Sequence, residues 1–246
     1  MREVDAYARL AGVYDAFVVD PCFAHWAEFL DDLFVTDPAR VASVLDLCCG
    51  TGWMDAELIS RGYRTVGLDA SAPMLDRARE RLGPDAVLVH ATLPDLPVAG
   101  PFDAAISTYD GFNYLTRGDL GTTLGRLAAV IRPDGWLAFD LHAEAMLQLA
   151  AANSPIEGLW DERPYAITYD VDMAERTCLS RVALTDDVGA FTEEHRQFIH
   201  DDATVRGALA AAGFDRVAIL DDYTLTPAGP ETLRATWVAR RSIPVD

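Results

Sequence analysis

Two glycines and two aspartates near the start of the chain have the types and spacing of a nucleoside-binding site. Gly50 and Gly52 follow a short apolar run that contains Asp46, and glycine at such a point lets a ligand lie against the backbone without meeting a Cβ. Asp69 ends the next apolar run, from where a carboxylate can accept hydrogen bonds from two ribose hydroxyls. The pattern predicts that a nucleoside binds where two neighbouring strands end.

Asp55 helps to distinguish between two kinds of nucleoside ligand, a dinucleotide and a nucleoside without phosphate. Dinucleotide sites place a third glycine at this position and aim backbone amides at a pyrophosphate, and an acid in the first helical turn would repel that pyrophosphate. S-adenosylmethionine (SAM) has no phosphate and carries an ammonium and a sulfonium group, so Asp46 and Asp55 are both compatible with it. These residues therefore favour SAM, with S-adenosylhomocysteine as its product, over a dinucleotide.

The elements that must position these residues alternate between strand and helix as far as His142. Amphipathic stretches of helix length separate five apolar runs of strand length, at 43–48, 64–69, 86–90, 102–108 and 136–141. This alternation is typical of βαβ units on a parallel sheet. It predicts a doubly wound α/β fold in which the first two strands end at the glycines and at Asp69.

The pattern changes at residues 143–200, which begin with a short Ala-rich helix and continue as three segments of alternating polarity. Such alternation is typical of antiparallel strands with one wet face. A helix and a hairpin-like strand pair follow. We expect one domain built from 1–142 and 201–246, with 1–35 as N-terminal capping helices, and an antiparallel β insertion at 143–200, after the fifth strand, that serves as a lid or a dimerisation surface.

The charge balance limits the partners. The chain has 20 Lys+Arg against 39 Asp+Glu, a formal net charge of -19, which opposes binding to nucleic acid or to an anionic membrane because both require clustered cations. No apolar run is long enough to span a bilayer, and the first residues do not form a secretory signal. The four cysteines lack zinc-ligand spacing. We expect a cytoplasmic protein that acts on a small molecule and holds no metal.

Four stretches between residues 40 and 142 make the chain recognisable: VLDLCCGTG, VGLDAS with PMLDRAR, FDAAIS, and IRPDGWLAFDLH. Together they resemble the motifs of class I SAM-dependent methyltransferases, and the resemblance implies a Rossmann-like fold with a seven-stranded sheet. The stretches YARLAGVYDAF, YDGFNYL and EEHRQF resemble, more narrowly, a bacterial small-molecule branch that includes amino-sugar N-methyltransferases.

The resemblance assigns nine residues to the cofactor: Asp46, Gly50, Gly52, Asp69, Ala70, Met74, Thr92, Leu93 and Ser107. It implies that the two glycines contact the methionine part, that Asp46 lies near its amino group and that Asp69 holds the ribose. Ala70 and Met74 would pack on the adenine, although Met74 is also suited to ordinary helix core. Much of the family has an acid at the position of Thr92, so either its side chain or the Leu93 amide would bind the adenine amino group.

Four further residues are candidates for the transfer reaction: Tyr14, Asp110, His142 and His195. Tyr14 matches a tyrosine that reaches over the active site in the amino-sugar enzymes, and a core aromatic is its alternative. Asp110 follows the fourth strand, beside the substrate in the family. His142 ends the fifth strand and is the first candidate for a general base, with a solvated strand-end histidine as the alternative. His195 is preferred over His200, because residues five apart on a strand face opposite sides.

These features predict N-methylation of a small amine, such as an amino sugar or another specialised metabolite. Tyr14, the Tyr109-Asp110 pair and the acidic charge motivate that prediction. Two alternatives remain: an O-methyltransferase in which His142 takes the hydroxyl proton, and a SAM-binding protein without methyl transfer. An exposed strand edge in 143–200 would also make a homodimer reasonable.

Overall fold

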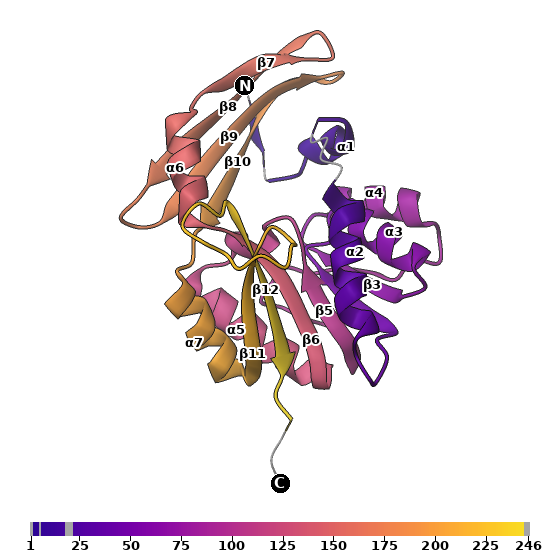
Figure 1. Ribbon diagram of the computed structural model, residues 1–246. Coiled ribbons are helices and arrows are strands. Elements are labelled where there is room, and N and C mark those ends of the chain that lie inside the picture. The colour runs from indigo at the N-terminus through magenta and orange to yellow at the C-terminus, as the bar shows by residue number, and fades with distance from the viewer. Residues whose placement is uncertain (1, 5, 18–21, 244–246) are drawn as a thin grey trace.

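The computed structural model describes residues 2–4, 6–17 and 22–243. Two sheets make up the framework, and the smaller one stands over one end of the larger (Figure 1). The larger sheet has the strand order β11-β12-β6-β5-β2-β3-β4. Its strands are β2 (Ser43–Leu47), β3 (Arg64–Asp69), β4 (Leu88–His90), β5 (Phe102–Ser107), β6 (Ile131–His142), β11 (Phe214–Asp221) and β12 (Arg234–Arg241).

The five strands β2 to β6 run parallel, and β12 pairs antiparallel with both β6 and β11. The predicted doubly wound α/β fold with a seven-stranded sheet is thus confirmed. Parallel pairing brings the carboxyl ends of β2, β3, β5 and β6 to one edge of the sheet, and ligands of such folds bind at that edge. Asp69, Ser107 and His142 all end their strands there.

Helices cover both faces of the larger sheet (Figure 1). On one face, α5 (Arg117–Val130) and α7 (Asp202–Ala212) bury Leu124, Leu127 and Leu209 against the strands. On the other, α2 (Cys22–Val35) and α3 (Trp53–Ser60) bury Trp26 and Leu58. A further helix, α4 (Ala72–Leu82), begins where Ser71 accepts a hydrogen bond from the Met74 amide, as an N-cap does.

The smaller sheet has the order β1-β10-β9-β8-β7, formed by β1 (Arg2–Val4), β7 (Ile156–Trp160), β8 (Arg163–Asp172), β9 (Thr177–Asp186) and β10 (Gly189–Phe198). Helix α6 (Glu144–Ala152) leads into it from β6. Strands β7 to β10 are antiparallel, which confirms the expected antiparallel insertion after the fifth strand of the larger sheet.

The expectation of helices throughout residues 1–35 is wrong for Arg2–Val4. These residues form β1, which pairs parallel with β10 at Phe191 to Glu193. A strand at the edge of a sheet carries unpaired backbone groups, and a short extended segment that satisfies them is a favourable partner. The first helical elements follow at η1 (Leu10–Gly12) and α1 (Tyr14–Phe17).

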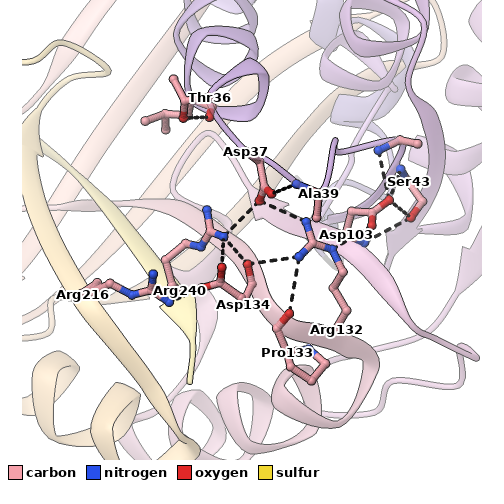
Figure 2. Close-up of polar contacts among 12 residues, drawn as sticks. Thr36, Asp37, Ala39, Ser43, Asp103, Arg132, Pro133, Asp134, Arg216 and Arg240 are labelled. Atoms are coloured by element: carbon pink, nitrogen blue, oxygen red, sulfur yellow. Dashed lines mark hydrogen bonds and ion pairs between the residues drawn. The ribbon is translucent and has the colours of Figure 1, made fainter. Parts of the chain in front are cut away.

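An ion-pair cluster closes the edge of the larger sheet that lies away from the smaller one (Figure 2). Asp37 follows α2 and is nearly fully buried, and its carboxylate lies 3.0 Å from both Arg132 and Arg240. Arg132 also lies 2.9 Å from Asp103, and Arg240 lies 2.8 Å from Asp134. The cluster ties α2 to β5, β6 and β12, and so fixes the strands whose other ends carry the site.

Candidate active site

A pocket of about 310 Å³ opens at the carboxyl edge of β2, β3 and β5. It is lined by Ala6, Tyr7, Tyr14, Phe23, Cys48, Cys49, Gly50, Thr51, Trp53, Met54, Asp69, Ala70, Ser71, Met74, Thr92, Thr108, Tyr109, Gly111 and Tyr114. A volume above about 300 Å³ is in the range of small-molecule and cofactor sites.

The turn after β2 shapes the floor of the pocket. Gly50 and Gly52 have φ of 54° and 77°, a left-handed backbone that costs glycine little. A Cβ on Gly52 would lie 3.1 Å from the side chains of Ala78 and Leu82, so the turn packs closely on α4. The Gly50 amide donates to Asp69 at 2.9 Å, and the Ser71 amide donates to the other oxygen of that carboxylate at 2.8 Å. Two backbone amides thus hold the Asp69 carboxylate between the two turns.

The chemistry of this lining fits SAM. Asp69 offers carboxylate lone pairs for ribose hydroxyls, and Ala70 and Met74 beside it provide an apolar surface for a flat ring. No arginine belongs to the lining, and the whole chain contains no lysine. A pyrophosphate would therefore find no cationic side chain among the residues that form these walls, whereas a sulfonium and an ammonium group need none.

The structure places the sequence-predicted residues unequally. Of the nine assigned to the cofactor, the lining contains Gly50, Asp69, Ala70, Met74 and Thr92. The other four, Asp46, Gly52, Leu93 and Ser107, do not belong to the lining. Leu93 packs partly buried against the core, and Ser107 is fully buried beside Cys48 and Gly111.

Asp46 is buried among protein groups instead of lining the pocket. Its carboxyl is 1% exposed and neighbours that of Asp55, which is 0% exposed. Burial, with the charge of Asp55, raises the pKa of Asp46 well above its usual range, and burial raises the pKa of Asp55 to about 6. Gly67 makes room for this pair, because a Cβ there would lie 3.0 Å from an Asp55 oxygen and 2.9 Å from the Cys49 sulfur.

We expect Asp55→Asn to stabilise the protein at pH 8. The pKa of Asp55 is raised on folding, so its favourable contribution is complete below about pH 4 and is lost as the pH rises through about 6. Above that range the folded state holds a buried charge that asparagine removes, a difference of at most about 3 kcal/mol. Urea unfolding between pH 4 and 8 measures it, with exposed Asp76→Asn as the control. Equal pH slopes for parent and Asp55→Asn would contradict the expectation.

Glu193 and Asp15 hold the N-terminal segment over the pocket. The buried carboxylate of Glu193 on β10 accepts hydrogen bonds from three backbone amides, those of Tyr7 (2.7 Å), Arg9 (2.6 Å) and Leu10 (2.8 Å). Asp15 in α1 accepts from Thr51 (2.7 Å) and from Trp53 (3.1 Å), beside the glycine turn. These contacts hold the N-terminal segment in a position where Tyr7 and Tyr14 line the pocket.

A chain of hydroxyls leads from the pocket into the smaller sheet. The Tyr7 and Tyr114 hydroxyls are 2.8 Å apart, and the Tyr114 hydroxyl lies 3.0 Å from Nδ1 of His195. Nε2 of His195 lies 3.6 Å from Glu193. Burial lowers the pKa of His195 to about 4 and raises the pKa values of Tyr7 and Tyr114 well above their usual range. His195 therefore reaches the pocket only through the two tyrosines.

Asp110 and His142 are neighbours that do not belong to the pocket lining, although Tyr109 and Gly111 on either side of Asp110 do. Nε2 of His142 is 3.5 Å from the Asp110 carboxylate, and an Arg234 nitrogen is 3.7 Å from it. The Gln197 side chain also donates to Asp110. His142 lines a second cavity instead, next to α6.

Sequence reasoning missed Tyr7, Tyr114, Glu193 and Gln197 as site residues. Tyr7 stands one heptad before Tyr14 and was attributable to the core of a short helix, and Tyr114 to packing of the next helix. Glu193 and Gln197 are a polar pair flanking His195 at two-residue spacing, so all three share one face of β10. That spacing was the only signal in the sequence.

Within residues 2–4, 6–17 and 22–243, no helix is long and apolar enough to cross a membrane. In the same part of the chain, no three His, Cys, Asp or Glu side chains come together as a metal site would require.

Comparison with known proteins identifies similar sequences. A family model for a methyltransferase domain matches residues 44–135. An uncharacterized methyltransferase of Geobacillus kaustophilus is 32% identical over 177 residues, which cover 68% of this chain and 80% of that protein. The dTDP-3-amino-3,4,6-trideoxy-alpha-D-glucopyranose N,N-dimethyltransferase of Streptomyces venezuelae is 34% identical over 138 residues, 55% of this chain and 56% of that protein.

Among solved structures, an S-adenosylmethionine-dependent methyltransferase from Clostridium acetobutylicum has a TM-score of 0.84 with this chain. The match covers 97% of this chain and 100% of the other, at 21% sequence identity. At that identity the likeness concerns the fold, and it includes the smaller sheet as well as the larger one because nearly every residue is matched.

Proposed function

Because this chain belongs to the SAM-dependent methyltransferase family, we propose that it transfers the methyl group to the amine nitrogen of a small molecule. The observation that carries the proposal is the hydrogen-bonded chain from Tyr7 through Tyr114 to His195. It gives the pocket a hydrogen-bond acceptor whose direction is fixed by buried groups.

The direction follows from the histidine tautomer. Nε2 of His195 faces the Glu193 carboxylate at 3.6 Å, and a bare nitrogen lone pair there would be repelled, so the proton of the neutral ring belongs on Nε2. Nδ1 then accepts the Tyr114 hydrogen, and the Tyr114 oxygen accepts the Tyr7 hydrogen. The Tyr7 oxygen keeps its lone pairs for an N–H group in the pocket.

The same acceptor suits N-methylation. SAM, when bound, would supply the methyl group on a sulfonium, and the lone pair of a neutral amine would form the C–N bond as the C–S bond breaks. The Tyr7 oxygen, by accepting a hydrogen bond from an N–H group of that amine, would direct the lone pair toward the methyl group. The product is an ammonium ion that releases its proton to solvent, because burial lowers the pKa of His195 to about 4 and so opposes its protonation.

The relatives support an amine acceptor, since two of them are named as N,N-dimethyltransferases of amino-deoxy sugars. The His142–Asp110 pair favours O-methylation as a second candidate, because a carboxylate that orients a histidine is a common general-base arrangement. In that reaction His142 would take the hydroxyl proton from the side of the second cavity.

We expect Tyr7→Phe to lower the rate of S-adenosylhomocysteine formation with an amine by about 100-fold, since it removes the hydrogen-bond acceptor that orients the amine. SAM affinity should stay within about twofold of the parent, because Tyr7 is assigned to the acceptor side. The matched control is Tyr63→Phe, which removes a hydroxyl bonded to Asp31 away from the pocket. Mass spectrometry and NMR of the product locate the new methyl group, and a methyl group on oxygen would refute N-methylation.

Location and assembly stay predictions. All four cysteines are free thiols, which supports the cytoplasmic location.

Two observations bear on the role of residues 143–200. The edge strand β7 exposes Leu159 and Ile156, which supports a homodimer through 143–200. The contacts between β10 and residues 6–12 support a lid instead. Size-exclusion chromatography with light scattering distinguishes monomer from dimer.

A further inference from the structure

A second cavity, of about 680 Å³, lies between α6 and the smaller sheet. Its walls are mainly apolar, with Met146, Leu149 and Ala150 from α6 facing Ile156 on β7 and Ile199 after β10. His142 and Gln197 also belong to its lining. Neither the cofactor assignment nor the transfer chemistry described above accounts for this space.

The cavity and the cofactor pocket share a wall. Gln197 donates to the Asp110 carboxylate, and His142 lies 3.5 Å from it. The residues on either side of Asp110, Tyr109 and Gly111, line the cofactor pocket. Asp110 therefore contacts two residues that line the second cavity and is flanked in the sequence by two that line the cofactor pocket, at the sheet edge where β5 and β6 end.

The lining of the cavity is unfavourable for a strongly anionic ligand. No arginine is among its lining residues, and the chain contains no lysine. Glu157 at its outer part carries negative charge, whereas burial raises the pKa of both Tyr169 and Cys178, which keeps these two groups neutral. The nearby Arg176 is already paired with Glu144 of α6 and donates to the Ile199 carbonyl, so the lining residues themselves offer a diphosphate no cation. An uncharged ring or alkyl chain of drug-like size suits such a space.

We propose that this cavity holds the apolar body of the methyl acceptor, so that the acceptor is an amine on a largely apolar framework and not on a nucleotide diphosphate. The inference rests on the proposed methyl transfer to an amine. The amine reaches past the Asp110 wall toward the cofactor pocket, and its apolar body stays between α6 and the smaller sheet.

Two phenylalanine substitutions on one helix test the cavity. Ala150→Phe places a ring inside it, whereas Ala151→Phe places the same ring on the exposed side of α6. Binding is followed by the fluorescence of N-phenyl-1-naphthylamine, a neutral apolar probe. We expect the parent and Ala151→Phe to bind the probe alike and Ala150→Phe to bind it at least about tenfold more weakly, with SAM affinity unchanged in all three.

Activity is measured separately, as S-adenosylhomocysteine formed from SAM with ethylamine, benzylamine, 4-phenylbutylamine or glucosamine. We expect kcat/KM to rise with the apolar size of the amine in the parent, and Ala150→Phe to raise KM for 4-phenylbutylamine at least about tenfold while the value for ethylamine is unchanged. Equal probe binding by both variants, or a preference for glucosamine, would overturn the inference. Selective loss of the probe in Ala150→Phe with no methylation of any amine would instead retain the apolar site and refute the proposed N-methylation.

Discussion

Replacing Glu193 with alanine is expected to detach residues 6–12 from the smaller sheet and to lower the free energy of unfolding by about 3 kcal/mol or more. The Glu193 side chain is fully buried and accepts the amide hydrogens of Tyr7, Arg9 and Leu10. Its loss leaves three donors without an acceptor, and each buried unsatisfied group costs about 1–3 kcal/mol. Methyl transfer should fall with it, because Tyr7 and Tyr14 then leave the pocket.

Urea unfolding and amide hydrogen exchange of residues 6–12 measure these two effects. Glu194→Ala is the matched control, since the adjacent Glu194 forms a partly exposed ion pair with Arg181, and such pairs contribute about 0–1 kcal/mol. Similar stability losses in the two variants, or unchanged exchange rates in Glu193→Ala, would show that Glu193 does not hold the segment.

Asp69→Ala is expected to weaken SAM binding by about 10- to 100-fold. The carboxylate holds the Gly50 and Ser71 amides and, when SAM is bound, would also accept the ribose hydroxyls. Hydrogen bonds to a charged group contribute about 1.5–3 kcal/mol, and about 1.4 kcal/mol corresponds to a tenfold change in affinity.

Calorimetric titration with SAM, S-adenosylhomocysteine and NAD in parallel measures this loss. The exposed Asp95, whose carboxylate pairs with Arg126 and does not belong to the pocket lining, supplies the control variant Asp95→Ala. Unchanged SAM affinity in Asp69→Ala would remove Asp69 from the cofactor site, and binding of NAD by the parent would reassign the pocket.

Local patterns predicted the larger sheet well. Four of the five parallel strands were expected within about two residues of their observed bounds, because a buried strand is a short apolar run closed by a turn. The fifth, β6, begins at Ile131, before the expected start at Trp136, because the backbone already pairs with Phe102 of β5 at Ile131. Strands β8 to β10 followed from alternating polarity in the same way. β7 was missed, since its sequence IEGLW is short and contains Gly158, and β1 was missed because three residues form a strand only through pairing with β10.

The site was predictable only where it is local. Asp69 and the glycines stand on neighbouring turns, so motif spacing was sufficient to propose them. Tyr7 and Glu193 meet across 186 positions of the sequence, and no short-range pattern records such a contact. Asp46 shows the reverse, since its place in a motif implied a ligand contact, whereas its side chain faces the interior, where Asp55 is its neighbour.

The absence of arginine from the lining of the cofactor pocket has a consequence for turnover. Among the described residues of that lining, Asp69 supplies a carboxylate, in a chain of net charge -19, so a sulfonium is attracted by its surroundings. Methyl transfer turns the sulfonium into an uncharged thioether. The electrostatic attraction between the pocket and the cofactor is therefore weaker after methyl transfer than before it. This favours release of S-adenosylhomocysteine and binding of another, positively charged SAM molecule.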